Sequence, residues 1–182
     1  MSQTADGYVI HEGCDHIFFI GFSGAGKSTI ARNIGKMFHR RYVDTDKMVE
    51  LAMGKSVASI FDSAGEEAFR REETAALRRL KRYKSLLVSC GGGIVERPEN
   101  LDLMHRMGFI VYLDGDLEDS LRQIQRFDKR PDFDGIDEAE ELFEHRRPLY
   151  STAADCTIDI RGKSFAEVAD TAASILWEYG LL

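Results

Sequence analysis

The sequence has few cysteines, no long apolar run and no basic start. Its three cysteines, Cys14, Cys90 and Cys156, form no CxxC pair, which argues against a disulfide framework and against a structural zinc site. No apolar run approaches the roughly 20 residues that span a bilayer. The N-terminal residues lack the basic and apolar parts of a signal peptide. We therefore expect a cytoplasmic protein that makes no contact with a membrane.

An excess of basic residues is also missing. Lys and Arg number 24 and Asp and Glu number 31, so the formal net charge is -7. Nucleic-acid binding needs a basic surface for phosphate contacts, so nucleic acid is not an expected partner. An anionic small substrate remains possible if local basic groups hold it. With 182 residues, of which 43% are hydrophobic, the chain is expected to form one domain with a real core.

Short apolar runs alternate with longer helical patterns along the chain. Continuous apolarity is typical of strands that are covered on both faces, as in a parallel sheet. The alternation therefore predicts an α/β layer fold with right-handed crossovers. The five apolar runs lie at 17–20, 42–43, 86–90, 109–113 and 156–160.

Two helix starts are marked by the capping-box spacing of Ser and Glu. Ser63 and Glu66 have this spacing and predict a helix over 63–82. Ser164 and Glu167 repeat it before the last helical pattern.

Residues 21–28 form a phosphate-binding motif, G-x-x-x-x-G-K-S, between an apolar run and a helical pattern. Glycines let the backbone N–H groups surround a polyphosphate, and the helix start adds the positive end of a dipole. Lys27 is expected to reach the β- and γ-phosphates, and the Ser28 hydroxyl to bind Mg²⁺. The predicted nucleotide-binding residues here are Gly24, Ala25, Gly26, Lys27, Ser28 and Thr29.

Two acidic residues follow the second apolar run. Asp44 and Asp46 stand at positions i and i+2, so at a strand end one carboxylate can serve a metal and the other an acceptor hydroxyl. The alternative is an acidic turn that caps the next helix.

The third run ends in three glycines, Gly91, Gly92 and Gly93. They indicate that a ligand or another backbone comes too close for side chains, or else that the turn is simply flexible. Arg70, Arg130 and Arg146, taken alone, are predicted to be solvated surface charges.

In combination these motifs resemble the shikimate kinase family of P-loop kinases. The resemblance covers about residues 17–178 and lies in 21–29, Asp44-Thr45-Asp46, Phe69-Arg70, Gly91-Gly92-Gly93, Arg130-Pro131 and Arg146-Arg147-Pro148-Leu149-Tyr150. It implies one domain over 1–182 with three α/β/α layers and a five-stranded parallel sheet. A loose arm over 1–15, a helical substrate-binding subdomain over about 45–80 and a lid over about 126–144 would complete it.

The same resemblance implies the roles of the acceptor-side residues. Asp46 would accept the substrate hydroxyl and its proton, and Arg70 and Arg146 would bind the substrate carboxylate with planar guanidinium groups. Gly91, Gly92 and Gly93 would approach the substrate ring. The reaction would move the γ-phosphate of ATP to the 3-hydroxyl of shikimate, a step of chorismate and aromatic amino-acid biosynthesis.

On the phosphate side the resemblance implies a catalytic role for Lys27 and Arg130, with Arg130 also contacting the nucleotide. Mg²⁺ would enter with ATP, bound directly by Ser28 and through water by Asp44. A monomer is expected, because no dimer surface is marked.

Two other functions stay open at this point. Another small-molecule acid kinase, such as a gluconate kinase, shares the phosphate loop and the chain length. The second is a nucleotide-binding pseudo-kinase with a regulatory role. It stays open because the sequence departs from the family's usual pattern at two places, at Asp132-Phe133 after Arg130-Pro131 and at Gln123.

Overall fold

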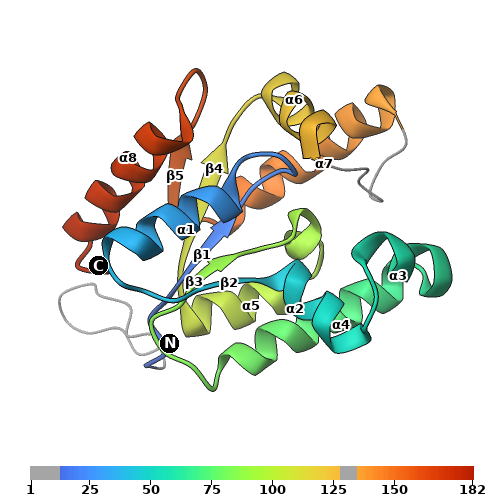
Figure 1. Ribbon diagram of the computed structural model, residues 1–182, viewed down its shortest axis with the longest axis horizontal. Helices are drawn as coiled ribbons and strands as arrows, with labels where there is room; N and C mark the ends of the chain where they lie inside the picture. The colour runs from blue at the N-terminus through green and yellow to red at the C-terminus, as the bar shows by residue number, and fades with distance from the viewer. Residues whose placement is uncertain (1–12, 128–134) are drawn as a thin grey trace.

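Each apolar run of the sequence forms a strand, and all five strands pair in parallel (Figure 1). The structure, a computed structural model, describes residues 13–127 and 135–182. The strand order is β2-β3-β1-β4-β5, which confirms the predicted parallel α/β sheet. The strands are β1 (His16–Ile20), β2 (Tyr42–Asp44), β3 (Leu87–Ser89), β4 (Gly108–Asp114) and β5 (Cys156–Asp159).

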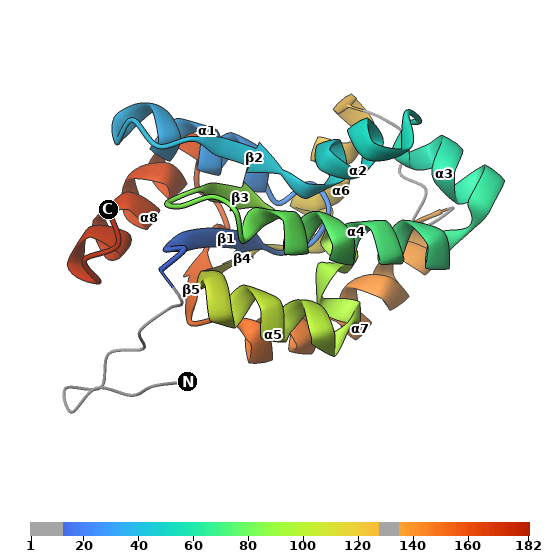
Figure 2. The ribbon, with the colours of Figure 1, turned by 90° about the horizontal axis from the view of Figure 1, so that it is seen from below.

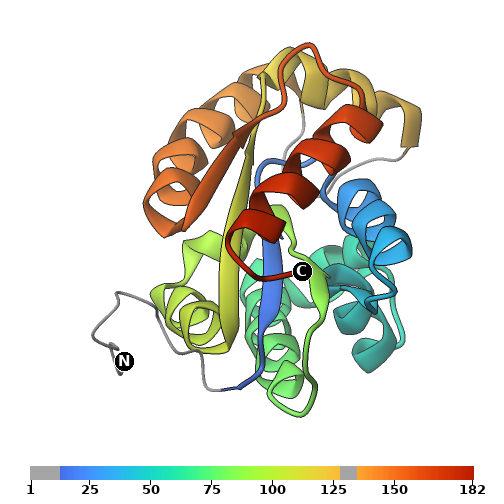
Figure 3. The same cartoon turned by 90° about the vertical axis from the view of Figure 1, so that its left-hand side faces the viewer.

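Helices cover both faces of the sheet and give the three layers (Figure 2). Helices α1 and α8 pack on one face, and Figure 3 looks onto α8. Helices α4, α5 and α7 pack on the other. The helices are α1 (Lys27–Met37), α2 (Thr45–Met53), α3 (Val57–Ala64), α4 (Glu66–Leu80), α5 (Pro98–Met107), α6 (Leu117–Phe127), α7 (Ile136–Ala153), α8 (Phe165–Glu178) and the 3₁₀ helix η1 (Gly92–Glu96).

The order of the strands determines where a ligand can bind. After β1 the chain crosses to β2 and β3 on one side of β1, and later to β4 and β5 on the other. Ligands of open α/β sheets bind beyond the carboxyl ends of the strands, next to such a reversal. The loops that follow β1, β2 and β3 are therefore placed to form the site.

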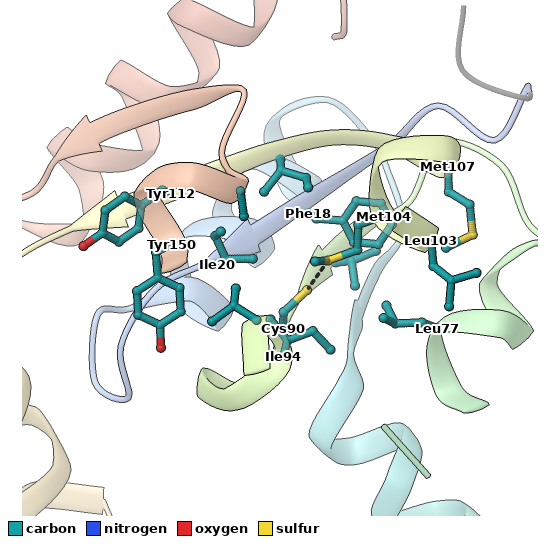
Figure 4. Packing of buried hydrophobic residues seen from close by; sticks show 14 of the residues in the cluster. Phe18, Ile20, Leu77, Cys90, Ile94, Leu103, Met104, Met107, Tyr112 and Tyr150 are labelled. Carbon is teal, nitrogen blue, oxygen red and sulfur yellow. Dashed lines mark hydrogen bonds between the residues drawn. The ribbon is translucent and has the colours of Figure 1, made fainter. Parts of the chain in front are cut away.

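The larger core cluster lies directly beneath the glycine triplet. Cys90 is 2% exposed, and its thiol lies 3.9 Å from the sulfur of Met104 (Figure 4). Burial raises the pKa of this thiol well above its ordinary value. The Tyr112 and Tyr150 rings stack at 5.3 Å in the same cluster. Cys90 is thus a small core residue that supports the loop above it.

Helices α2, α3 and α4 carry a small core of their own. Val49, Ile60, Phe69 and Ala76 are all at most 3% exposed and pack together. These helices span most of the segment predicted to bind the substrate. Because Phe69 is packed in this core, the backbone of the next residue, Arg70, is held in place.

One of the two predicted capping boxes is wrong. Ser63 belongs to the end of α3, and α4 begins after Gly65, whose φ of 81° separates the two helices. No described side chain caps α4. The other prediction is confirmed, because Ser164 and Glu167 exchange both bonds of a capping box.

The predicted arm and lid are only partly described. Residues 1–12 and 128–134 lie outside the described residues, and Arg130 with them. Cys14, counted in the predicted arm, is buried, and its carbonyl accepts the N–H of Ser85 at 2.7 Å. Within the described part of the chain, no helix has the length and apolarity to cross a membrane.

His16 joins three segments at the end of the sheet opposite the site. It is 1% exposed, its Nδ1 accepts the N–H of Leu86 at 3.2 Å, and its Nε2 lies 3.1 Å from the carbonyl oxygen of Leu80. The two contacts require a neutral ring with its proton on Nε2. Burial lowers the pKa of His16 below 6.5.

We expect the free energy of unfolding to decrease as the pH falls below 6.5. The unfolded chain then binds a proton that the native His16 resists, so stability present above this pH is lost below it. Urea unfolding between about pH 8 and about pH 5 measures the effect. In His16→Leu the unfolding free energy should fall by about 1–3 kcal/mol, since two buried backbone groups lose partners. The unfolding free energy of His16→Leu should also change less with pH than that of the parent. An equal change with pH in the two proteins would show that His16 is not the group responsible.

Candidate active site

A cleft of about 690 Å³ opens beyond the carboxyl ends of β1, β2 and β3. It brings together nearly all the described residues that the motifs single out. From the predicted set its walls include Gly24, Gly26, Lys27, Ser28, Thr29, Asp44, Asp46, Arg70, Gly91, Gly92 and Gly93. Ala25 instead lines an adjoining cavity of about 320 Å³, together with Gly24 and Gln123.

The phosphate loop connects β1 to α1 as its motif predicts. Gly26 adopts the left-handed conformation, with φ 83°, and a Cβ there would lie 2.4 Å from the Phe165 ring. Only glycine fits this position without strain. No described side chain caps α1, so its first N–H groups remain suited to an anion.

Lys27 is folded back into the loop. Its ammonium group donates to the carbonyl oxygens of Gly21 and Phe22, both at 2.8 Å, and the residue is 8% exposed. Oxygen atoms therefore surround the charge at the floor of the cleft. Phosphate oxygens offer the same ligand chemistry with a full negative charge.

Asp44 connects the phosphate loop with the end of β2. Its Oδ2 accepts the hydroxyl of Ser28 at 2.9 Å, and its Oδ1 accepts the N–H of Lys47 and caps α2. The Ser28 oxygen also lies 2.9 Å from that of Ser89, at the end of β3. The alternative of a helix cap is confirmed for Asp44, and its role toward a metal stays a prediction.

Asp46 points elsewhere, because α2 begins at Thr45 and the alternation of a strand has ended there. A Cβ added to Gly91 would lie 2.4 Å from the Asp46 Oδ1 and 2.7 Å from the Glu73 Oε1. The Thr45 hydroxyl accepts the Gly91 N–H at 2.9 Å and holds the loop against α2. Asp44 and Asp46 both line the cleft but contact different groups, Ser28 for Asp44 and the glycine triplet for Asp46. The expectation that both lie at a strand end is wrong for Asp46, which is in α2; the two roles stay predictions.

Arg70 is a buried cation on α4. It is 5% exposed, and its guanidinium donates to Glu73 at 3.1 Å and to Glu66 at 3.0 Å. A Cβ on Gly93 would lie 2.1 Å from Nη2. The prediction of a solvated surface charge is therefore wrong for Arg70.

Arg146 approaches the triplet from the other side, on α7. It is 2% exposed and its Nε donates to Glu96 at 2.7 Å. Its Nη1 lies 3.4 Å from the place a Cβ on Gly92 would take. Arg146 therefore lies beside Gly92, which lines the cleft, but is not itself one of the lining residues.

These contacts give a physical reason for the glycine triplet. At Gly91 and Gly93, charged side chains occupy the space that a Cβ would need, and at Gly92 the Ser23 hydroxyl, 3.2 Å from that place, leaves little room for one. The sequence predicted such an approach by a ligand or a backbone. The structure shows that the protein's own side chains make it: two carboxylates at Gly91, the Ser23 hydroxyl at Gly92 and the Arg70 guanidinium at Gly93.

Several residues that complete the site were missed from the sequence. Glu66 and Glu73 lie four residues before and three after Arg70, a spacing that places all three on one helix face and could have revealed them. Glu96 had no local signal, since 50 positions separate it from Arg146.

Comparison with known proteins gives a consistent result. A family model for shikimate kinase matches residues 23–177 of the chain. The shikimate kinase of Dehalococcoides mccartyi is 37% identical over 167 residues, which cover 91% of this chain and 95% of that protein. A solved shikimate kinase from Acinetobacter baumannii, in complex with shikimate, has a TM-score of 0.85 at 28% identity and covers 92% of this chain and 95% of its own. A gluconokinase from Sinorhizobium meliloti shares the fold alone, with a TM-score of 0.53 at 16% identity over 92% of this chain and 94% of its own.

Proposed function

The chain belongs to the shikimate kinase family, and we propose that its cleft transfers the γ-phosphate of ATP to the 3-hydroxyl of shikimate. The observation that carries this proposal is one cleft lined by both a phosphate loop and a buried arginine. The loop suits a nucleoside triphosphate, and the arginine suits the carboxylate of a small acid. Family membership favours shikimate over gluconate as that acid.

The phosphate side would bind ATP through the backbone of the loop, Ser28 and Thr29. Lys27 would exchange its carbonyl contacts for oxygens of the β- and γ-phosphates. Preorganised positive groups at this place stabilise charge as it spreads over the transferring phosphoryl group. Arg130 is proposed as a further cation here from the family resemblance alone.

The oxygen donors beside the loop fit Mg²⁺, which shikimate kinases generally need together with ATP. The Ser28 and Asp44 oxygens are 2.9 Å apart at the cleft wall, and Mg²⁺ prefers oxygen ligands while retaining several waters. Ser28 would hold the ion directly and Asp44 through a water molecule. When bound, the ion neutralises charge on the phosphate oxygens.

The acceptor side would orient the substrate. Asp46 would accept a hydrogen bond from the 3-hydroxyl and take its proton as the oxygen attacks the γ-phosphorus in line. The bond from phosphorus to the bridging oxygen breaks, and ADP leaves. Arg70 would bind the carboxylate from the cleft wall, and Arg146 would reach it beside Gly92, where its Nη1 lies. The two would fix the ring against Gly91, Gly92 and Gly93.

The enzyme is further proposed to act as a cytoplasmic monomer.

Release of ADP from Mg·ATP, with shikimate or gluconate as the acceptor, tests the function. We expect strong stimulation by shikimate alone, with turnover of about 1–100 s⁻¹. Stimulation by gluconate alone would indicate the other acid kinase. ATP binding without stimulation by either acid would indicate a pseudo-kinase.

A further inference from the structure

A carboxylate outside the reacting groups holds Arg146. Arg146 carries its charge at 2% exposure, and its Nε donates to the Glu96 Oε1 at 2.7 Å. Because a buried cation is costly without an anionic partner, this contact has a large influence on where the guanidinium lies. The planar shape of the group means that fixing Nε also restricts the direction of its two terminal nitrogens.

Glu96 is itself held by the frame that carries the glycine triplet. It is the last residue of η1, which begins at Gly92. The Tyr150 hydroxyl donates to the carbonyl of Gly92 at 2.5 Å, and the Asn100 amide donates to the carbonyl of Ile94 at 3.0 Å. The two ends of η1 thus contact Tyr150 and Arg146, which are one helical turn apart on α7.

The second oxygen of Glu96 is also engaged. Its Oε2 lies 3.0 Å from Nε2 of His145, whose side chain is 60% exposed. Burial raises the pKa of Glu96, but the hydrogen bonds from Arg146 and His145 outweigh it and leave the pKa below its ordinary value. The carboxylate is therefore ionised at neutral pH, with one oxygen directed at Arg146.

We propose that Glu96 is a positioning residue that keeps Arg146 in register with Gly92 and so determines the affinity for the substrate carboxylate. This inference rests on the proposed function. Glu96 does not line the cleft; it acts through Arg146. The effect should therefore fall on the acceptor and leave the nucleotide side unchanged.

The test measures the shikimate KM, the ATP KM and kcat for Glu96→Ala and Glu96→Gln. In Glu96→Ala the shikimate KM should rise roughly 10-fold or more, since one partner of a buried charged pair is lost. The ATP KM and kcat should stay at the parental values, because a change confined to substrate binding raises the KM of that substrate alone. Glu96→Gln keeps the size and one acceptor oxygen, so it should recover part of the affinity.

A double-mutant cycle separates positioning from general stability. In an Arg146→Ala background, adding Glu96→Ala should leave the shikimate KM unchanged, because the residue through which Glu96 acts is gone. Glu99→Ala removes the same charge at an exposed position on α5 and should match the parent.

A parental shikimate KM in Glu96→Ala would overturn the inference, as would additive effects in the cycle or equal increases of both KM values. Failure of the proposed function gives a different result, because the parent enzyme itself would then show no shikimate-dependent release of ADP.

Discussion

Asp46→Asn should lower kcat by about 10²–10⁴-fold, the usual contribution of a positioned general base. Asparagine keeps the size of the side chain against Gly91, but it cannot take the proton of the attacking hydroxyl. The KM for ATP should change little, because Lys27 and the phosphate loop are untouched. Steady-state release of ADP at varied ATP and shikimate measures all of these quantities.

Asp62→Asn is the matched control for this variant. Asp62 is exposed on α3, so the same change of one charge should leave kcat at the parental value. If Asp46→Asn keeps parental kcat, the proton is taken by another group and the assignment of Asp46 is wrong.

Replacing either arginine of the carboxylate site should weaken shikimate binding by about 2–5 kcal/mol, as for truncation of a buried charged partner. Arg70→Ala removes a guanidinium at the cleft wall, and Arg146→Ala removes the one that packs against Gly92. Titration calorimetry with shikimate measures the loss directly. Binding of ATP should match that of the parent, because neither arginine belongs to the phosphate loop.

Arg70→Ala has a second consequence, for stability. Glu73 is 0% exposed and is paired with Arg70, so the alanine variant leaves a buried carboxylate without this cation and should lower the unfolding free energy by about 3–5 kcal/mol. Arg70→Lys keeps the charge but lacks the planar fork. Arg70→Lys should therefore have a higher unfolding free energy than Arg70→Ala, but it should still bind shikimate more weakly than the parent.

Arg78→Ala serves as the control on the same helix, because Arg78 is exposed and pairs with Glu99 at the surface. If Arg70→Lys and Arg146→Ala both bind shikimate as tightly as the parent, the carboxylate lies elsewhere.

The sheet could be predicted from the sequence because its signals are local. Uninterrupted apolar runs such as 17–20 are typical of a strand that is covered on both faces, and this run forms one. The phosphate loop was equally clear, since its motif fixes the turn and the helix start together. The capping box at Ser63 failed because spacing alone carried no information on Gly65, whose positive φ ends one helix and begins another.

The site was predicted residue by residue but not contact by contact. Asp46, Arg70 and the triplet were predicted as site residues and line one cleft, yet nothing local showed that Glu96 contacts Arg146 across 50 positions. The burial of the two arginines could not be predicted from the sequence either, because a charged residue in a helix is usually solvated. Only the packed structure shows that Arg70 and Arg146 are buried.

The most direct measurement compares shikimate with its methyl ester as the phosphate acceptor. The ester keeps the ring and the 3-hydroxyl but lacks the negative charge that the buried arginines are proposed to bind. Since a site built for a charged partner rejects an analogue that lacks it, kcat/KM should fall at least about 100-fold for the ester. Equal kcat/KM for the two compounds would contradict a carboxylate site built from Arg70 and Arg146.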